Sequence, residues 1–298
     1  MICRYAITVF TPTYNRAHTL PRLYESLVRQ ATPELFEWLI IDDGSTDDTE
    51  SVVNEWIGEG IIHIHYVKTE NGGKPRAINN AVGYARSPYL FIVDSDDFLV
   101  DDAIEFMVAK CNEVRCEQNI AGVGCLQGDK NKIAKKKVLI TDYVDATNLQ
   151  RSKYGLDVDC NEAYKIDILR RYPFYVWPGE TFVPEEIVLN EMALDGYIIR
   201  WHNKVNVISE YLDGGLTKSS WQLVRKNPMG YAMLYEHKLK FERSLQRKIY
   251  NTLQMIAQSI LGHNPEFPFR GKHKLLAIMC FPIGALLAVR RKYQYRHL

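Results

Sequence analysis

The first hundred residues alternate short runs of β-branched and aromatic residues with amphipathic stretches of helical period. The strand-like runs are residues 5–11, 37–41, 61–68 and 89–93, and the helical stretches are residues 20–30, 47–56 and 75–85. This alternation is typical of a parallel sheet covered by helices on both faces. We therefore expect an α/β fold with a Rossmann-like, mostly parallel sheet, whose first two helices are capped by Asn15 and Thr46.

The chain changes character twice beyond this region. Residues 101–201 have mixed α and β character, with strand-like runs at 120–127 and 162–168 and a lysine-rich surface loop, residues 130–137, between them. Beyond Ser219 the pattern is helical and is broken at Asn227-Pro228 and Asn264-Pro265. We expect one domain over residues 1–218 and a helical C-terminal extension over residues 219–298.

The charge balance and the cysteines limit the class of protein. Thirty-seven Lys and Arg against 36 Asp and Glu give a formal net charge of +1, which is not the basic field of a nucleic-acid binder. The six cysteines contain no C-x-x-C pair, so neither a zinc ribbon nor a disulfide framework is indicated. The N-terminus reaches Pro12 without the apolar core of a signal peptide. We expect a cytoplasmic protein with no nucleic-acid partner.

Polar loops follow all four predicted strands, at residues 11–16, 42–45, 71–74 and 94–97. Open parallel sheets bind ligands beyond the carboxyl ends of their strands, so we expect these loops to line one crevice. Asp94 and Asp96 lie two residues apart after the fourth strand, which places their carboxylates on one face roughly 7 Å apart. Mg²⁺ or Mn²⁺ would relieve their repulsion and would take its remaining oxygens from a diphosphate.

A second interpretation of these acidic residues is a capped turn that leads into the next helix. The neighbouring loops favour the metal site instead. Asp42 and Asp43 also close a strand, and the third loop offers backbone donors and positive charge from Gly72, Gly73, Lys74 and Arg76. We therefore expect a diphosphate and a divalent cation in this crevice.

Three segments of this region resemble the inverting glycosyltransferases of family 2, which have the GT-A fold. They are Val9-Phe10-Thr11-Pro12-Thr13-Tyr14-Asn15-Arg16, then Leu39-Ile40-Ile41-Asp42-Asp43-Gly44-Ser45-Thr46-Asp47, then Asp94-Ser95-Asp96-Asp97. The resemblance implies a GT-A catalytic domain over residues 1–218, with a nucleotide-binding half at 1–100 and an acceptor-binding half at 101–218. It also implies a UDP-sugar donor and Mn²⁺ or Mg²⁺ as cofactor.

The resemblance carries over residue by residue to the donor site. It implies that the nucleoside is held by Thr11, Pro12, Tyr14, Arg16, Asp42 and Asp43. It places Asp94 near the ribose and Asp96 on the metal, with Asp97 as an alternative ligand, and it groups Gly73, Lys74 and Ser95 with the donor. Some relatives use a histidine after the catalytic helix as a further metal ligand, which makes His202 a candidate, although a lone histidine in a strand is more often structural. In one branch of the family, a segment similar to residues 210–217 borders the active site.

Inverting transfer needs a carboxylate that deprotonates the acceptor and a charge sink on the leaving diphosphate. In the family this carboxylate lies at the start of a helix, and residues 179–186 lead into an amphipathic stretch that ends at Gly196, with Pro184 in its first turn. Counting back from Gly196 selects Glu185, whereas the family's dipeptide pattern selects Glu186. We take Glu185 as the base and keep Glu186 as the alternative. A simpler role for both glutamates is to complement the helix dipole.

Residues 275–289 form an almost unbroken apolar run that is shorter than a membrane span and contains Pro282 and Gly284. Basic residues flank the run on both sides, and no acidic residue lies between Arg270 and Leu298. We expect residues 270–298 to bind the surface of an anionic membrane. A buried helix that packs on protein fits the composition equally well.

These features predict a metal-dependent, inverting glycosyltransferase that adds a single sugar to a saccharide acceptor carried on a polyprenyl diphosphate, at the inner face of a bacterial cell membrane. The lipid-linked acceptor rests on analogy with relatives in capsule and lipopolysaccharide assembly. A sugar nucleotidyltransferase is one rival, but residues 11–16 lack the glycines of its phosphate loop. A donor-binding subunit without activity is another rival, but Asp94, Asp96 and Glu185 are all present.

Overall fold

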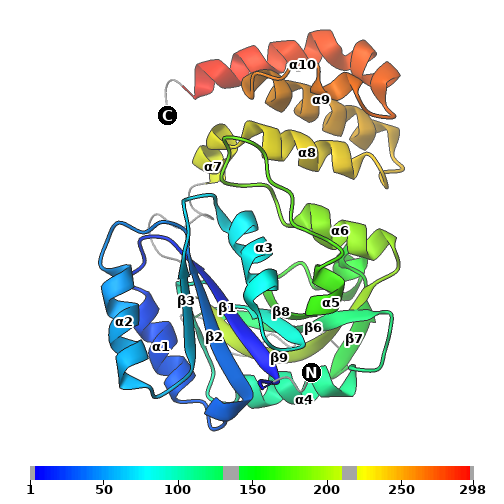
Figure 1. The fold of residues 1–298 in the computed structure, drawn as a ribbon. Helices are drawn as coiled ribbons and strands as arrows, with labels where there is room; N and C mark the ends of the chain where they lie inside the picture. Colours follow the sequence, from blue (N-terminus) through cyan, green and yellow to red (C-terminus); the bar gives the residue numbers. More distant parts are fainter. Residues whose placement is uncertain (1–3, 130–140, 210–219, 296–298) are drawn as a thin grey trace. The chain divides into compact units, whose positions relative to one another are not determined.

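The computed structural model describes residues 4–129, 141–209 and 220–295 (Figure 1). The chain forms two compact units. The sheet unit comprises Met1–Pro173 and Val188–Leu212, and the C-terminal unit comprises Phe174–Ile187 and Asp213–Leu298. The sequence pattern suggested a single division at residue 218, so the grouping of Phe174–Ile187 with the C-terminal helices was not expected. The lysine-rich loop and residues 210–217 lie outside the described residues.

One mixed sheet forms the centre of the sheet unit, with the strand order β3-β2-β1-β4-β8-β6-β9-β5 and with β7 paired to β9. Its strands are β1 (Ile7–Thr13), β2 (Phe36–Asp42), β3 (Ile64–Lys68), β4 (Tyr89–Ile92), β5 (Asp97–Leu99), β6 (Ile120–Asp129), β7 (Tyr143–Ala146), β8 (Cys160–Lys165) and β9 (Ile198–Ser209). The first four strands run parallel, whereas β8 runs antiparallel to both β4 and β6. The predicted α/β fold with a mostly parallel sheet is confirmed.

Alternate residues of the central strands pack against helices on opposite faces of the sheet. Ile7 and Val9 of β1 share one buried apolar cluster with residues of α1 (Leu20–Val28), α2 (Thr49–Glu59) and α4 (Ala103–Glu113). Helix α3 (Lys74–Tyr84) packs against β1 and β2 from the other face (Figure 1). The strands are buried on both faces, which explains why they have continuous apolar runs rather than strict alternation.

The first two helices begin later than the capping residues predicted. Helix α1 starts at Leu20 after Thr19, and α2 starts at Thr49 after Asp48, so neither Asn15 nor Thr46 is an N-cap. Asn15 instead adopts a left-handed backbone with φ of 53°, a conformation that asparagine tolerates better than most residues. The prediction of these two caps was wrong because the side chains of Asn15 and Thr46 form hydrogen bonds that join the loops after β1 and β2.

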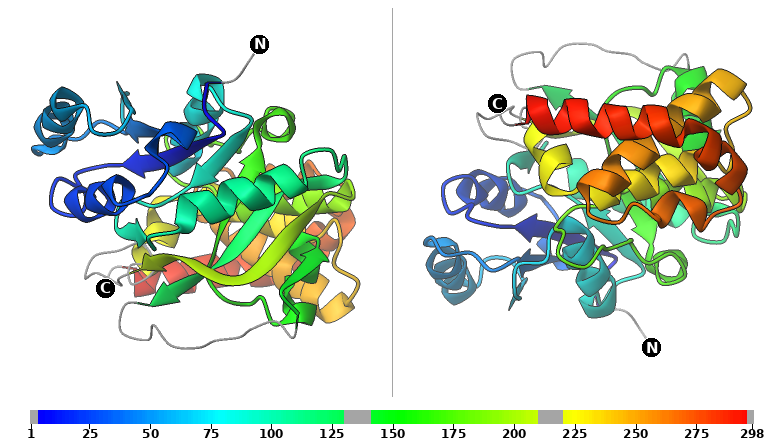
Figure 2. Two further views of the ribbon diagram at one scale, coloured as in Figure 1. Left: turned by 90° about the horizontal axis from the view of Figure 1, so that it is seen from below. Right: turned by 90° about the horizontal axis from the view of Figure 1, so that it is seen from above.

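The C-terminal unit is helical, as the sequence indicated. It contains α7 (Ser220–Lys226), α8 (Pro228–Lys238), α9 (Leu245–Leu261), the 3₁₀ turn η3 (Phe267–Phe269) and α10 (Lys274–Gln294). Helix α9 packs on both α8 and α10 (Figures 1 and 2). Both predicted breaks fall between helical elements, Asn227-Pro228 between α7 and α8 and Asn264-Pro265 between α9 and η3. Among the described residues, no helix combines the length and apolar character needed to cross a bilayer.

A glycine allows α10 to approach α9 closely. A Cβ atom added at Gly284 would lie 2.6 Å from Cγ2 of Ile256, which is closer than real Cβ contacts come. Ala277 and Ala288 are buried on the same helix. Small side chains therefore form the inner face of α10, and its large apolar side chains are left for the outer face.

Candidate active site

The loops after β1 and β2 are joined by the side chain of Asn15. Its Oδ1 accepts a hydrogen bond from the amide of Thr46 at 2.8 Å, and its own amide donates to Oγ of Ser45 at 2.8 Å. The backbone amide of Asp43 also donates to the carbonyl of Thr13 at 2.8 Å. These bonds bring together two polar loops that the sequence separates by about thirty residues.

Asp43 joins the second loop to the third. Its two carboxylate oxygens accept hydrogen bonds from the amides of Gly72 and Gly73, each at 2.7 Å. Burial raises the pKa of Asp43, while the two amide donors act in the opposite direction. Gly73 has a φ of 86°, a left-handed conformation that favours glycine, and it directly precedes α3. The carboxylate of Asp43 therefore holds the start of α3 in place.

Asp42 is completely buried and also makes structural hydrogen bonds. Its carboxylate accepts from the amide of Ser45 at 2.7 Å and from the hydroxyl of Tyr66 on β3. Burial and the bond to Asp42 raise the pKa of Tyr66, so this hydroxyl stays protonated as a donor. Both aspartates after β2 thus shape the loops around the crevice.

The acidic segment after β4 lies beside the other loops, and each of its first two aspartates faces a cation. Nζ of Lys74 lies 2.8 Å from Oδ1 of Asp94, and a guanidinium nitrogen of Arg16 lies 3.7 Å from Oδ2 of Asp96. The guanidinium of Arg22 donates to the backbone carbonyl of Asp96. The structure therefore brings Arg16, Asp43, Lys74, Asp94 and Asp96 to the carboxyl edge of the parallel strands, which we call the donor edge.

Asp97 is different from its two acidic neighbours because it is buried. Nε2 of Gln127 on β6 donates to its Oδ2 at 2.7 Å. Burial raises the pKa of Asp97 to about 8, and the nearby carboxylates of Asp94 and Asp96 add to the shift. Its backbone pairs with Ser209 of β9, which fixes the end of the acidic turn. Asp97 is thus a buried support of the turn, whereas the side chains of Asp94 and Asp96 are partly exposed.

The carboxylates of Asp94 and Asp96 fit a hard divalent cation. Their side chains are 45% and 26% exposed, and carboxylate oxygens are the ligands that Mg²⁺ and Mn²⁺ prefer. In the part of the chain that the structure describes, no group of three or more Asp, Glu, His or Cys residues is arranged to hold a metal. A cation held by two carboxylates would take its other ligands from water and phosphate oxygens.

The remaining residues expected at the nucleoside differ in exposure. Tyr14 is 48% exposed, and Pro12 is partly exposed. Thr11 is fully buried, and its hydroxyl accepts a hydrogen bond from the indole of Trp38 at 3.0 Å. Ser95 is also buried. The side chain of Thr11 therefore packs inside the sheet unit and leaves only its backbone for a ligand.

His202 does not lie at the donor edge. His202 lies on β9, where it pairs with Cys125 of β6 and Tyr143 of β7. It precedes Ser209, the partner of Asp97, by seven residues on the same strand. At about 3.3 Å per strand residue this separation is roughly 20 Å. The ring packs edge-on against Phe106 of α4 at 5.5 Å, and burial lowers the pKa of His202 to about 4. The structure thus separates this candidate metal ligand from the aspartates and gives it a packing role.

Glu185 and Glu186 belong to the C-terminal unit. Helix α6 (Glu186–Leu194) starts two residues after Pro184, so the proline precedes the helix instead of occupying its first turn. Nζ of Lys238 on α8 lies 3.3 Å from Oε2 of Glu186. An ammonium group thus engages the carboxylate of Glu186.

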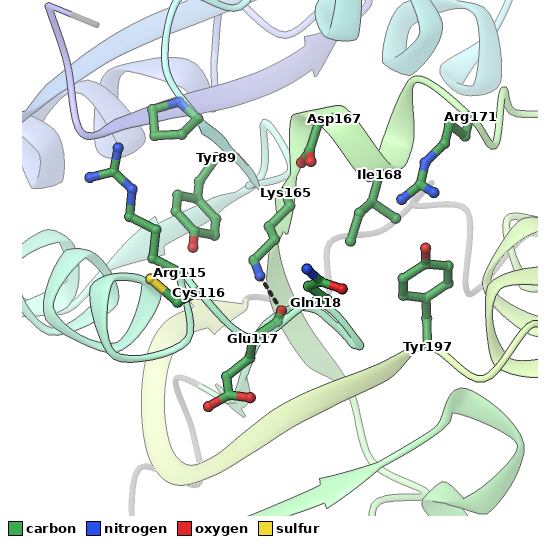
Figure 3. A pocket seen from close by; sticks show the side chains of 11 residues that line it. Tyr89, Arg115, Cys116, Glu117, Gln118, Lys165, Asp167, Ile168, Arg171 and Tyr197 are labelled. Atoms are coloured by element: carbon green, nitrogen blue, oxygen red, sulfur yellow. Dashed lines mark hydrogen bonds between the residues drawn. The ribbon is translucent and has the colours of Figure 1, made fainter. Parts of the chain in front are cut away.

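A cavity of about 470 Å³ opens elsewhere in the sheet unit, at the amino end of β4 (Figure 3). Nζ of Lys165 points to its wall and donates to the carbonyls of Val114 and Glu117 at 2.8 and 2.7 Å. The hydroxyl of Tyr89 donates to the carbonyl of Cys111. Lys165 and Tyr89 therefore donate to backbone carbonyls of the protein. The cavity lies at the end of β4 opposite to Asp94, and we assign it no ligand.

Sequence reasoning missed two residues that build the donor edge. Asn15 was assigned to a helix cap, although the Asn15 side chain bonds a loop thirty residues away. No sequence pattern indicated the role of Gln127, because the sequence of a strand does not show which side chain an amide will contact across a sheet. Tertiary contacts alone reveal both roles.

Comparisons with known proteins give one matching family model and several relatives. The family model described as "Glycosyl transferase family 2" matches residues 8–172. Chondroitin synthase of Escherichia coli is 32% identical over 155 residues, which are 52% of this chain and 21% of that protein. Hyaluronan synthase of Pasteurella multocida is 36% identical over 99 residues, which are 33% of this chain and 10% of that protein. The matched region is thus about a tenth to a fifth of these relatives.

Solved structures share the fold. The structure of S. aureus TarS 1-349 in complex with UDP-GlcNAc has a TM-score of 0.62 at 17% identity and covers 98% of this chain and 92% of that one. A mannosyltransferase from Pyrobaculum calidifontis, in complex with GDP-Man and Mn²⁺, has a TM-score of 0.55 at 17% identity, with 98% and 83% covered. At 17% identity these similarities establish the fold alone.

Proposed function

The chain belongs to glycosyltransferase family 2 and has the GT-A fold, and from this premise we propose that it transfers a single sugar from a UDP-sugar to a saccharide acceptor with inversion. The observation that carries the proposal is the donor edge, where the partly exposed carboxylates of Asp94 and Asp96 lie beside Lys74 and Arg16. The TarS structure that contains UDP-GlcNAc supports a uridine nucleotide as the donor.

We assign the metal to Asp94 and Asp96 and the pyrophosphate to the adjoining cations. A bound Mn²⁺ or Mg²⁺ would supply the charge sink for the leaving diphosphate. Lys74 and Arg16 now neutralise the aspartates, and the same cations are placed to bind phosphate oxygens when a donor enters. Asp97 is the alternative ligand, but its burial and its bond to Gln127 favour a supporting role.

The nucleoside would lie between the first two loops. Tyr14 is exposed there and offers a ring on which a base can stack. Pro12 and the backbone of Thr11 would line the pocket floor, while Asp42 and Asp43 keep the loops in shape. Gly73 and Ser95 would complete the donor set from the loops after β3 and β4.

Glu185 is our candidate for the general base that removes the proton from the acceptor hydroxyl. The assignment rests on the family pattern at the start of α6, with Glu186 kept as the alternative. A carboxylate in this role would be expected to contribute about 10²- to 10⁴-fold to the rate.

Calorimetric titration with UDP tests the donor edge directly. We expect UDP to bind the wild-type chain with Mn²⁺ and at least tenfold more weakly in excess chelator. Asp96→Asn should reduce the affinity with Mn²⁺ to a similar extent, because one metal ligand is lost. Asp101→Asn is the matched control, since Asp101 is an exposed carboxylate that pairs with Arg29. Equal UDP affinity with Mn²⁺ and with chelator would remove the metal from the proposal.

The outer face of α10 supports a membrane-bound acceptor. Its large exposed side chains recur every three or four residues: Leu275, Ile278, Met279, Ile283, Leu286, Val289 and Tyr293. Such spacing places them on one side of the helix. Exposed cations lie near both ends of α10, at Lys272, Lys274, Arg290 and Lys292, and the helix contains no acidic residue. An apolar face between basic ends suits the interfacial region of an anionic bilayer.

A second copy of the chain fits this face less well. Pairing two α10 helices in antiparallel fashion would bring the basic start of one helix against the basic end of the other, and like charges repel. We propose that α10 lies on the cytoplasmic leaflet, so that the enzyme is peripheral on the inner face of the cell membrane. The acceptor saccharide would be presented there on a polyprenyl diphosphate.

Sedimentation with vesicles tests the surface of α10. We expect the chain to bind vesicles of phosphatidylglycerol more strongly than vesicles of phosphatidylcholine, and Ile283→Glu to weaken that binding. Ile57→Glu is the matched control, because Ile57 is exposed on α2 of the sheet unit. Equal binding of the two vesicle types would contradict the charge argument, and loss of dimerisation in Ile283→Glu would identify a second copy as the partner.

A further inference from the structure

The segment 174–187 of the C-terminal unit, which we call the base segment, is bonded to the start of helix α8. Oε1 and Oε2 of Glu180 accept hydrogen bonds from the amides of Met229 and Gly230 at 2.7 and 2.8 Å. These amides belong to the first turn of α8, where helix N–H groups have no partner within the helix. The positive end of the helix dipole also favours a carboxylate there.

Asn227 completes the attachment from the opposite direction. Its Oδ1 accepts from the backbone amides of Thr181 and Phe182 at 2.9 and 3.0 Å, while its Nδ2 donates to the carbonyl of Leu223 at 2.9 Å. Glu180 of the base segment thus accepts from backbone amides of α8, and Asn227 at the start of α8 accepts from backbone amides of the base segment. Asn227 is 1% exposed and Glu180 is 9% exposed, so water does not replace these bonds easily.

Close packing reinforces the bonds. A Cβ atom added at Gly230 would lie 2.3 Å from the carbonyl oxygen of Phe182, so α8 can approach the segment only because this residue is glycine. Val183 and Ile187 are buried with Leu234 of α8 in one small apolar cluster. Glu185 lies between these two buried positions in the chain, so contacts with α8 fix the backbone on both sides of it.

We propose that helix α8 positions the catalytic base, because Glu180, Asn227 and Gly230 hold the backbone of the segment that carries Glu185. This inference rests on the proposed function of Glu185. It makes Glu180 a positioning residue: its carboxylate holds the backbone of the base segment and exchanges no proton with the substrate. It also gives the helical extension a direct role in transfer besides its role at the membrane.

Hydrogen exchange measures the attachment independently of activity. In Glu180→Ala we expect the amides of Met229 and Gly230 to exchange at least tenfold faster than in the wild type, because they lose their acceptor. The amides of Thr181 and Phe182 should also exchange faster as the segment is released, with unchanged exchange in the centre of α9. Glu180→Gln, which keeps one acceptor oxygen, should show a smaller increase. Glu266→Ala is the matched control, because Glu266 lies in the same unit and forms an exposed ion pair with Arg270. Unchanged exchange in Glu180→Ala, or equal acceleration throughout the C-terminal unit, would overturn the proposal.

Kinetics separate positioning from general stability. The substrate is whichever of UDP-GlcNAc, UDP-glucose and UDP-galactose the wild type hydrolyses fastest with Mn²⁺, and UDP release is measured well below the unfolding temperature. Glu180→Ala and Gly230→Ala should lower kcat at least tenfold and leave the dissociation constant of UDP within twofold. Wild-type kcat in both variants would refute positioning while the proposed function stood. If the wild type released no UDP and bound none with Mn²⁺, the proposed function would fail, and hydrogen exchange would still test the attachment.

Discussion

The donor edge and the base segment are held in place by different arrangements of contacts. At the donor edge, Asn15, Asp43 and Lys74 each join a different pair of loops. The base segment is attached to the start of α8 by the hydrogen bonds of Glu180 and Asn227, and Trp177 of the segment also packs against Phe267. The donor edge should therefore keep its shape when one structural bond is lost, whereas loss of the Glu180 carboxylate removes two hydrogen bonds of the base segment at once. This difference suggests that donor binding and transfer can be damaged separately.

The largest effect is expected where the donor edge contacts the reacting group. Asp96→Ala should lower UDP release by about 10³-fold or more, because a preorganised charge at the leaving group is lost. The measurement is steady-state UDP release with saturating Mn²⁺. Asp101→Ala, the control, should leave the rate within twofold. Activity of Asp96→Ala near that of the control would contradict the proposed role of the donor edge at the leaving group.

The second prediction is that a change in the base segment lowers kcat without changing the UDP affinity of the donor edge. Glu185→Gln should lower kcat by about 10²-fold or more, because the amide cannot accept the proton, while UDP affinity with Mn²⁺ stays unchanged. Calorimetry and steady-state kinetics on the same preparation provide both values. Glu186→Gln is the control in the same turn, and a larger loss there would move the base by one residue.

The third prediction concerns His202, which the fold removes from the donor edge. Burial holds its pKa at about 4 against an ordinary value of 6.5, so the folded chain keeps the ring neutral while the unfolded chain takes up a proton below pH 6.5. This contribution to stability is complete above pH 6.5 and is lost as the pH falls towards 4, to a limit of about 3 kcal/mol.

Urea unfolding between pH 7.5 and 4.5 checks this prediction. The free energy of unfolding should fall more steeply with decreasing pH in the wild type than in His202→Gln, which has no ionisable group. The affinity for UDP with Mn²⁺ should be the same in both proteins. A loss of metal-dependent UDP binding in His202→Gln would show that this residue belongs to the donor edge after all.

The smallest effect tests the redundancy of the donor edge. Asn15→Ala removes the hydrogen bond to the amide of Thr46, which should cost about 1 kcal/mol of unfolding free energy. UDP affinity should fall by less than tenfold, because Asp43 and the backbone still hold the loops. Thermal unfolding and calorimetry give the two values. A loss of UDP binding as large as that in Asp96→Asn would mean that a single bond holds the donor edge.

Much of the sheet unit could be predicted from local patterns. The strands and helices of the first hundred residues follow the predicted runs to within a few residues, because β-branched runs and helical periodicity act over short distances. The polar loops were predicted to meet because parallel strands end at one edge, and Asp43, Lys74 and Asp94 do lie there. The caps failed, since Asn15 and Thr46 bond across loops, and the short strand β5 was not predicted.

The sequence by itself determined the order of strands and helices, the acidic turn after β4 and the apolar character of α10. Tertiary structure alone decided that His202 packs on α4, that residues 174–187 belong with the C-terminal helices, and which side of α10 is exposed. The physical reason is the range of the interactions. Strand and helix formation depends on neighbours in the chain, whereas burial, pKa shifts and the partner of a buried glutamate such as Glu180 depend on groups fifty residues away.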